Sequence, residues 1–337
     1  MSLLPGAILV VTSVTFSGDG MKRIAVAGLV LFSGMAACQA KGQSATWQPS
    51  PGHTQVALWP GATPDEQATK EPETVTVYRE KPVAGGPWTY ISNVSRPTIT
   101  VYSPQGKNTG AAVVVFPGGG YNILAIDLEG TEVCDWLTAD GITCVLLKYR
   151  VPHTGPQYDP KCRCQRNPMV PVAREDAQRA LSLVRSRAKD WHIDPRKIGV
   201  LGFSAGGHLV ADVSTHFAQR AYKPVDAADK ESCRPDFAVA LYPGHLWLEP
   251  KFELNPDIRV TKDTPPTFLV QAEDDPVDSI NNTLVYFVAL QKAGVPAEMH
   301  VYPHGGHAFG LRRTEQPITE WPRLVEKWLK TIGMIAE

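Results

Sequence analysis

The chain has 337 residues, of which 43% are hydrophobic, 20% charged and 8% aromatic. This composition is ordinary for a globular protein, and it argues against disorder, a coiled coil or a polytopic membrane protein. Because 33 Lys and Arg residues stand against 34 Asp and Glu residues, the formal net charge is −1, and no nucleic-acid partner is expected.

Residues 1–40 have the pattern of a processing signal. A basic start is followed by a short apolar run at 24–31 and by small residues before Cys38. This order is typical of a secretory signal, whereas residues 1–20 look like upstream sequence. The small residues before Cys38 also resemble a bacterial lipoprotein box, in which this cysteine would carry a lipid anchor to the membrane; cleavage near Ala40 is the alternative. We therefore expect an exported protein that is periplasmic, outer-membrane-anchored or secreted.

Residues 41–70 are rich in Pro, Gly, Thr and Gln and are predicted to be a linker, which leaves residues 71–337 as a single domain. Two segments, 74–78 and 98–102, alternate apolar with polar residues as half-exposed strands do. Short apolar runs typical of strands buried on both faces follow at 111–116, 144–149, 198–203, 237–242 and 268–271. Helical patterns lie at 129–139, 172–191, 205–217, 279–293 and 319–332.

This alternation of buried strands and helices predicts an α/β fold. We expect a mostly parallel sheet with helices on both faces and antiparallel strands at its N-terminal side. In such sheets, ligands bind outside the carboxyl ends of the strands. The loops that leave those ends are therefore where functional residues are expected.

The pattern Gly-x-Ser-x-Gly occurs at residues 202–206, where an apolar strand run meets a helical pattern. A serine at such a turn sits on a tight bend, and the flanking glycines relieve crowding against neighbouring backbone. The helix N-terminus then faces any negative charge that develops beside the serine. Ser204 is therefore predicted to be a catalytic nucleophile.

A serine hydroxyl is a poor nucleophile until a base removes its proton, and after this type of turn the acid and then the histidine are expected further along the chain. Asp275 follows an apolar strand run, with Glu273 and Asp274 as alternatives. His307 follows the next strand, with His304 as the competing base. His307 would take the proton, while Asp275 would fix its tautomer and stabilise the imidazolium.

A second apolar strand run leads into a triple-glycine loop at residues 118–120. Glycines let backbone N–H groups approach a substrate carbonyl without obstruction by a Cβ atom. Gly119 and Gly120 are predicted to be oxyanion donors, and Ala205, directly after the nucleophile, is predicted to supply the remaining one. Neither a Gly-Lys-Ser/Thr nor a Gly-x-Gly-x-x-Gly pattern follows the loop, which disfavours phosphate binding.

The chain has six cysteines, one of which is Cys38. Cys162 and Cys164 lie in a Pro-rich loop and could bridge to Cys233, and any cysteine left over would be a buried thiol. A zinc site would need a second ligand pair at the right spacing, and the sequence has none. No metal is expected.

Several stretches together carry a resemblance to a known family. They are the Gly-x-Ser-x-Gly turn at 202–206, the loop from Pro117 to Tyr121, Asp-Leu-Glu-Gly at 127–130 and Leu-Lys-Tyr-Arg at 147–150. Over about residues 95–335 the chain resembles an α/β-hydrolase. More narrowly, it resembles bacterial carbohydrate esterases of the acetyl-xylan and feruloyl-esterase-like type, near the hormone-sensitive-lipase branch. Pro117 replaces the His that opens the oxyanion motif of the lipase-like branch, which favours the carbohydrate-esterase side.

The resemblance implies an exported serine esterase that needs no cofactor and removes acetyl or aromatic acyl groups from plant-wall polysaccharide or from a small-molecule ester. It carries over, by position, the triad and the oxyanion donors named above. Two alternatives share this chemistry: a general short-chain carboxylesterase and a serine peptidase of the prolyl-oligopeptidase type. A third belongs to another class, a non-catalytic sugar-binding surface lipoprotein, and an intact triad disfavours it because binding needs no base.

Substrate specificity is expected to reside in two insertions at strand ends, residues 151–170 and 243–266. Tyr121, Trp247 and Tyr158 could stack on sugar or aryl groups, because aromatic faces suit both. Each of these rings could equally pack its loop onto the core.

Overall fold

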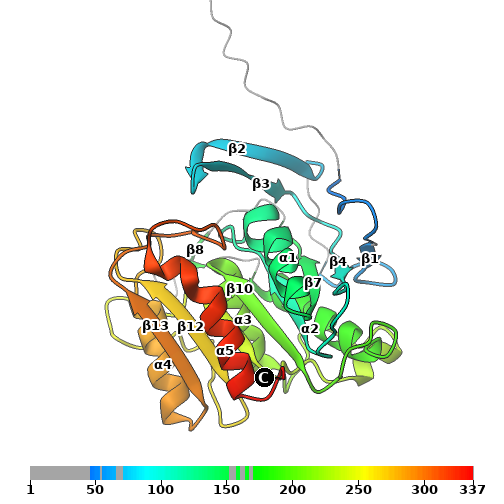
Figure 1. The fold of residues 1–337 in the computed structure, drawn as a ribbon. Coiled ribbons are helices and arrows are strands. Elements are labelled where there is room, and N and C mark those ends of the chain that lie inside the picture. Colours follow the sequence, from blue (N-terminus) through cyan, green and yellow to red (C-terminus); the bar gives the residue numbers. More distant parts are fainter. Residues whose placement is uncertain are drawn as a thin grey trace, which may run out of the picture. The chain divides into compact units, whose positions relative to one another are not determined.

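The structure is a computed structural model that describes residues 46–53, 55–65, 71–151, 157–159, 164–166 and 170–336, with only the backbone described at 157–159 and 164–166. These residues belong to one compact unit built around an eight-stranded sheet (Figure 1). The predicted signal and the candidate lipidation site at Cys38 lie outside the described residues.

The strands of the central sheet follow the order β1-β4-β7-β5-β10-β11-β12-β13. They are β1 (Gln55–Ala57), β4 (Thr98–Tyr102), β5 (Ala112–Phe116), β7 (Thr143–Lys148), β10 (Ile198–Phe203), β11 (Ala238–Leu241), β12 (Thr267–Ala272) and β13 (Ala297–Tyr302). Adjacent strands from β7 to β13 in this order pair in parallel, whereas β4 pairs antiparallel with both β1 and β7. The predicted mostly parallel sheet with antiparallel N-terminal strands is confirmed.

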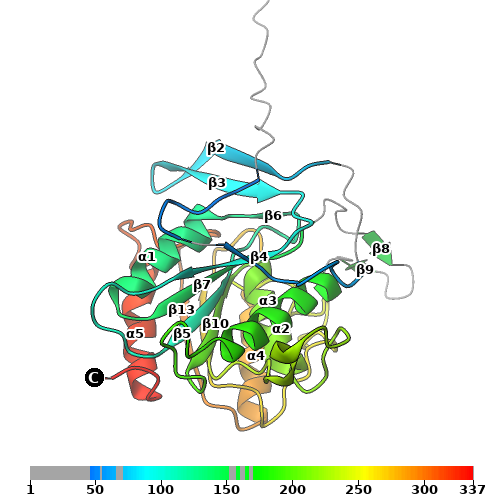
Figure 2. The same cartoon turned by 90° about the vertical axis from the view of Figure 1, so that its right-hand side faces the viewer.

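Helices cover both faces of this sheet. They are α1 (Glu132–Ala139), α2 (Val170–Ser186), α3 (Ala205–His216), α4 (Asn281–Lys292) and α5 (Trp321–Thr331), with the short turns η1 (Asp127–Thr131), η2 (Ala227–Lys230) and η3 (Pro317–Glu320). Helices α1 and α5 lie on one face, and α2, α3 and α4 lie on the other (Figures 1 and 2). Among the described residues, no helix combines the length and the apolarity needed to cross a bilayer.

Burial explains why the sequence pattern predicts the inner strands so directly. Every residue of β5, β7, β10, β11 and β12 is buried. Strands with helices on both faces need apolar side chains on both sides, so their sequences read as continuous apolar runs. Strand β13 lies at the edge of the sheet and keeps most of its side chains partly exposed. Its sequence is correspondingly more polar.

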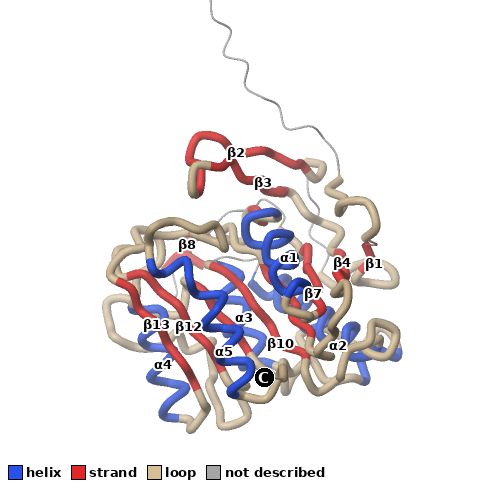
Figure 3. Tube along the Cα trace, viewed as in Figure 1, coloured by secondary structure: helices blue, strands red, loops and turns tan. Residues whose placement is uncertain are grey.

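A second sheet is formed by β2 (Thr74–Val83), β3 (Gly86–Ser92) and β6 (Ile123–Leu124), all antiparallel. Figure 3 shows β2 and β3 as a hairpin apart from the central strands. Strand β6 comes just after the triple-glycine loop, which ties the hairpin to the carboxyl end of β5. The half-exposed strand expected at 74–78 therefore belongs to this separate sheet.

The predicted linker at residues 41–70 is wrong for the part that the structure describes. Strand β1 pairs with β4 at the edge of the central sheet. The next two side chains, Leu58 and Trp59, are buried in the core, and Trp59 Nε1 donates a hydrogen bond to Asp176 Oδ1 at 2.8 Å. Polar composition concealed this short edge strand because an edge strand buries few of its residues.

The cysteines pair differently from the expectation. Cys134 of α1 and Cys144 of β7 form a disulfide, which joins the helix to the strand beneath it. Cys233 is a free, buried thiol, so of the two possibilities that the sequence left open for it, the structure shows the thiol and not the bridge. The side chains of Cys162 and Cys164 lie outside the described residues.

Candidate active site

Ser204 stands on a strained turn between β10 and α3. Its φ of 53° and ψ of −117° place a non-glycine residue in a region that L-amino acids rarely adopt. A Cβ atom on Gly202 would collide with the Gly206 carbonyl, and one on Gly206 would collide with the Phe116 carbonyl. Only glycine fits on either side of the serine, so the local sequence enforces the bend.

The loops after β12 and β13 bring an acid and a histidine to this serine. His307 Nε2 lies 3.0 Å from Ser204 Oγ, and His307 Nδ1 lies 2.7 Å from Asp275 Oδ2. Because a carboxylate only accepts hydrogen bonds, Nδ1 carries the proton and Nε2 is left to accept from the serine hydroxyl. The structure thus brings together the three residues that the sequence selects.

The charge environment of His307 favours its protonated form. Burial lowers the pKa of this imidazole, but the hydrogen bond with Asp275 and the negative charges of Asp275, Asp278 and Glu129 raise the pKa above its usual 6.5. The side chain of His307 is 13% exposed and that of Asp275 is fully buried. A base in this setting is strengthened because the imidazolium it forms is stabilised by nearby anions.

Asp275 is held in place by several donors. Its Oδ1 accepts from the backbone N–H groups of Val277 and Asp278 at 2.8 and 3.0 Å. Its Oδ2 also accepts from Gln271 Nε2 at 3.0 Å, and Gln271 Oε1 is fixed in turn by the Thr283 hydroxyl. These bonds set the direction of the carboxylate before it meets the histidine.

The alternative acids and base lie elsewhere. Asp274 and His304 form their own pair, with Nδ1 3.2 Å from Oδ2 and side chains that are 43% and 69% exposed. Glu273 is exposed and follows the end of β12. None of these three side chains contacts Ser204 among the described interactions.

Two of the predicted oxyanion donors, Gly119 and Gly120, line the same pocket as Ser204. Gly119 has a φ of 133° and Gly120 a φ of 61°, so both adopt conformations that favour glycine. A Cβ atom on Gly119 would also collide with the carbonyl of Ile123. Ala205 is the first residue of α3, and its N–H belongs to the first turn, where a helix has no internal acceptors. Gly119 and Gly120 thus lie in the wall of the pocket that contains Ser204, and Ala205 follows the serine directly; their role as oxyanion donors stays a prediction.

The buried side chain of Glu129 holds the start of the triple-glycine loop through hydrogen bonds. Its Oε2 accepts from the Gly118 N–H at 2.7 Å, and its Oε1 accepts from the Tyr242 hydroxyl at 2.9 Å. Burial raises the pKa of this carboxyl, and these two hydrogen bonds partly oppose the effect. Tyr149 adds a hydrogen bond to the Pro117 carbonyl at 2.6 Å. The chain is thereby held at Pro117 and Gly118, where the loop begins.

Ser204 opens into a pocket of about 380 Å³. An apolar part of its wall includes Trp88, Ile123 and Leu128, and a polar part includes His245 and Asp278. Sequence reasoning missed Trp88, which lies on β3, and Asp278, which lies just beyond the triad acid. The sequence could have pointed to Asp278, because it lies on the same loop as the triad acid. No sequence feature pointed to Trp88, because it belongs to a different sheet and is far from the triad residues in the chain.

Tyr121 does not serve as a stacking residue, which corrects the prediction. Its ring is fully buried, and its hydroxyl lies 2.6 Å from His208 Nδ1. Burial lowers the pKa of His208 and raises that of Tyr121, so a neutral imidazole accepts a hydrogen bond from a neutral phenol. Tyr121 packs the loop onto the core.

Of the other two candidate aromatics, only the side chain of Trp247 lies within the described residues. Trp247 is half-buried in the insertion after β11, where it pairs with Leu254 and its Nε1 donates to the Lys251 carbonyl at 2.5 Å. It does not line the pocket at Ser204. The side chain of Tyr158, on the short strand β8 (Gln157–Asp159), lies outside the described residues. Strand β8 pairs with β9 (Cys164–Arg166).

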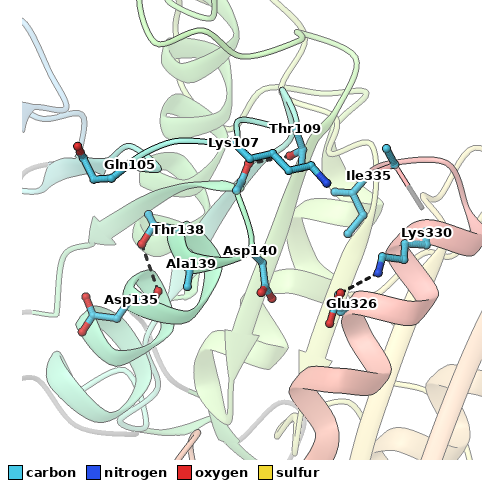
Figure 4. A pocket seen from close by; sticks show the side chains of 12 residues that line it. Gln105, Lys107, Thr109, Asp135, Thr138, Ala139, Asp140, Glu326, Lys330 and Ile335 are labelled. Atoms are coloured by element: carbon cyan, nitrogen blue, oxygen red, sulfur yellow. Dashed lines mark hydrogen bonds and ion pairs between the residues drawn. The ribbon is translucent and has the colours of Figure 1, made fainter.

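A second cavity, of about 520 Å³, has no part in this site. Figure 4 shows its walls, which include Asp135 and Asp140 near the end of α1 and the ion pair between Lys330 and Glu326 of α5. No triad residue lines it. Within the residues that the structure describes, no group of three His, Cys, Asp or Glu side chains is arranged to hold a metal ion.

Two family models match the chain in succession. The BD-FAE family matches residues 99–241, which include the triple-glycine loop and the nucleophile. The prolyl oligopeptidase family matches residues 242–333, which include the acid and the histidine.

Solved structures decide the family. The acetyl ester-xyloside bifunctional hydrolase from Caldicellulosiruptor lactoaceticus is 33% identical with a TM-score of 0.63, and the match covers 84% of this chain and 97% of that one. MGS-M1, an α/β hydrolase enzyme from a Medee basin deep-sea metagenome library, is 25% identical with a TM-score of 0.55, over 77% and 98% of the two chains. The chain belongs to the α/β-hydrolase family.

This α/β hydrolase also has a relative of known activity. It is 29% identical over 266 residues to the acetylxylan esterase of Xylanibacter ruminicola, a match that covers 72% of this chain. The match covers 50% of the relative, so the chain spans about half of that protein's length.

Proposed function

We propose that this protein is a serine esterase that hydrolyses carboxylic esters through an acyl-enzyme. Its proposed substrates are acetylated or aromatic-acylated carbohydrates of the plant wall. The observation that carries the proposal is the continuous hydrogen-bonded chain from Ser204 Oγ through His307 to Asp275, with distances of 3.0 and 2.7 Å. It stands beside a fixed glycine loop that can receive an oxyanion.

The first half of the reaction follows from this geometry. Ser204 Oγ attacks the carbonyl carbon of the ester while its proton passes to His307 Nε2. The charge that develops on the carbonyl oxygen is received by the N–H groups of Gly119, Gly120 and Ala205. When the intermediate collapses, His307 gives its proton to the leaving alcohol oxygen, and the acyl group remains on the serine.

Water completes the second half. It attacks the acyl-enzyme while His307 takes one of its protons, and the same oxyanion donors receive the charge. Collapse of this second intermediate returns the proton to Ser204 and releases the acid. Asp275 stabilises the imidazolium in both halves.

Two further observations support the choice of substrate. The C. lactoaceticus structure is described as an acetyl ester-xyloside hydrolase, and the X. ruminicola relative as an acetylxylan esterase. The pocket at Ser204 measures about 380 Å³, which suits a short acyl group better than a long fatty chain. Polar side chains on part of its wall suit a hydroxylated alcohol.

The test is acetate release from acetylated xylan, measured beside p-nitrophenyl esters of short and long acids. We expect release from the polymer together with a preference for the short esters. Ser204→Ala should abolish both reactions in a protein that remains folded by circular dichroism. Activity on small esters alone would indicate a general short-chain carboxylesterase and would contradict the carbohydrate assignment.

The match of residues 242–333 to the prolyl oligopeptidase family raises a second candidate, since peptidases use the same triad. A prolyl p-nitroanilide peptide tested under the same conditions separates the two. We expect turnover of the ester and none of the anilide. Faster cleavage of the anilide would replace the esterase proposal with a peptidase.

We also propose that the protein is exported. The disulfide between Cys134 and Cys144 supports this, because disulfides persist mainly in oxidising compartments. Mass spectrometry of the mature N-terminus, with Cys38→Ala as the comparison, distinguishes cleavage near Ala40 from lipidation at Cys38. A full-length chain recovered from the cytoplasm with reduced cysteines would contradict export.

A further inference from the structure

A second carboxylate reaches the nucleophile from within the pocket. Asp278 Oδ2 lies 3.3 Å from Ser204 Oγ and 3.8 Å from His307 Nε2. Its side chain is 15% exposed, and it lines the pocket that Ser204 opens into. Its position therefore differs from that of Asp275, which binds the opposite nitrogen of the imidazole.

The triad does not use this carboxylate. A serine hydroxyl has one hydrogen, and in the first step that hydrogen passes to His307 Nε2. At rest the same hydrogen has two possible acceptors, His307 Nε2 at 3.0 Å and Asp278 Oδ2 at 3.3 Å, and the described interactions give the Asp278 side chain no other hydrogen-bond donor. During catalysis Asp278 is thus a carboxylate that faces the pocket without a described protein donor within hydrogen-bond distance, and a donor on the substrate can take that place.

The surrounding structure keeps room for this group. A Cβ atom on Gly244 would collide with the Asp278 carboxylate, so glycine at that position leaves the carboxylate its space. Burial raises the pKa of Asp278, and neighbouring Asp275 adds to that effect, whereas His307 and His245 oppose it. A donor from the substrate would stabilise the ionised form.

The direction of proton transfer places the substrate's alcohol beside Asp278. To receive the proton, the leaving alcohol oxygen must come within about 3 Å of His307 Nε2. Asp278 Oδ2 lies 3.8 Å from that same nitrogen. The leaving oxygen and Asp278 Oδ2 are then both neighbours of His307 Nε2, so a hydroxyl on the adjacent carbon of the alcohol can reach the carboxylate while the acyl group stays bonded to Ser204.

We infer that Asp278 is a specificity-determining residue for the alcohol half of the substrate. It accepts a hydrogen bond from a hydroxyl on the carbon adjacent to the esterified one. The preferred substrates are then partially acylated sugars with a free vicinal hydroxyl, rather than esters of simple alcohols. This inference rests on the proposed esterase function and names the feature of the alcohol that the site recognises.

A matched pair of small esters isolates this feature. The substrates are trans-2-hydroxycyclohexyl acetate, whose two oxygens stand as neighbouring oxygens do on a pyranose ring, and cyclohexyl acetate, which lacks only the hydroxyl. Acetyl migration in the first compound regenerates the same compound, so its identity is stable during the assay. The readout is the ratio of the two kcat/KM values.

For the wild-type enzyme we expect the hydroxyl ester to be preferred by about tenfold or more, as is typical of a hydrogen bond to a charged acceptor. Asp278→Ala should bring the ratio close to one, and Asp278→Asn should leave an intermediate ratio, because an amide oxygen accepts without charge. Glu273→Gln, a neutralised acid that is exposed on the same loop, should keep the wild-type ratio.

Three outcomes are distinguishable. A wild-type ratio near one overturns the inference. An Asp278→Ala enzyme that loses the same factor on both esters also overturns it, since Asp278 would then act through His307 and not on the alcohol. If the wild-type enzyme hydrolyses neither ester nor p-nitrophenyl acetate, the proposed function itself fails. Labelling of Ser204 by a fluorophosphonate shows that each variant is folded at the site.

Discussion

Two Asp–His pairs stand side by side in this enzyme, built from the same residue types on the same two loops. Asp275 and His307 lie 2.7 Å apart with side chains that are 0% and 13% exposed. Asp274 and His304 lie 3.2 Å apart with side chains that are 43% and 69% exposed. Only the first pair reaches Ser204.

The difference is one of position rather than chemistry. Asp275 turns inward and is fixed by Gln271 and by backbone N–H groups. Asp274 turns outward and accepts from the backbone N–H groups of Gly305 and Gly306 at 3.0 and 2.8 Å. The outer acid thus shapes the loop that carries the histidine, while the inner acid orients its ring. Consecutive residues divide the two tasks.

The largest contrast is expected between the two histidines. His307→Ala removes the base and should lower kcat by about 10⁴-fold or more, as removal of a triad histidine does in other serine hydrolases. His304→Ala should change kcat by less than about threefold, because an exposed ion pair contributes little. Hydrolysis of p-nitrophenyl acetate measures both. The reverse pattern would assign the base to His304.

A smaller contrast is expected between the two acids. Asp275→Asn should lower kcat by about 10⁴-fold, because an amide donor beside Nδ1 favours the wrong tautomer of His307. Asp274→Asn keeps an oxygen that can accept from the N–H groups of Gly305 and Gly306, and it should lower kcat by less than about tenfold. Equal losses in the two variants would mean that the loop shape, and not the orientation of the imidazole, limits the reaction.

The pH dependence sharpens the comparison further. Activity requires neutral His307, so kcat/KM should fall as the pH drops through the pKa of His307, which lies above its usual 6.5. Asp278→Asn removes one of the charges that raise this pKa and should move the acidic limb to lower pH. Asp274→Asn should leave the limb in place. If Asp274→Asn also shifts the acidic limb of the pH profile, the charge of the outer Asp274–His304 pair influences the pKa of His307.

The smallest effect is expected on stability. The outer pair is exposed, and solvent screens such pairs effectively. The double variant Asp274→Asn with His304→Ala should therefore unfold at nearly the same urea concentration as the wild-type protein, followed by tryptophan fluorescence. A large drop in the midpoint would show that the outer pair holds the loop more firmly than its exposure indicates.

The sequence by itself determined the fold class and the central features of the site. Buried parallel strands need apolar residues on both sides, and the nucleophile turn needs glycines at 202 and 206, so both leave local patterns that can be read directly. The order of serine, acid and histidine then selected residues that the structure brings into contact. Their catalytic roles remain predictions that the variants above test.

Tertiary structure alone decided the rest. Polar composition at residues 41–70 could not show that β1 joins the sheet, and an aromatic next to a glycine loop could not show that Tyr121 is buried. Trp88 lines the pocket although it belongs to another sheet, and Asp278 lies 3.3 Å from Ser204. Both contacts join segments that are far apart in the chain. Local patterns record what each segment buries, whereas the pocket depends on which segments meet.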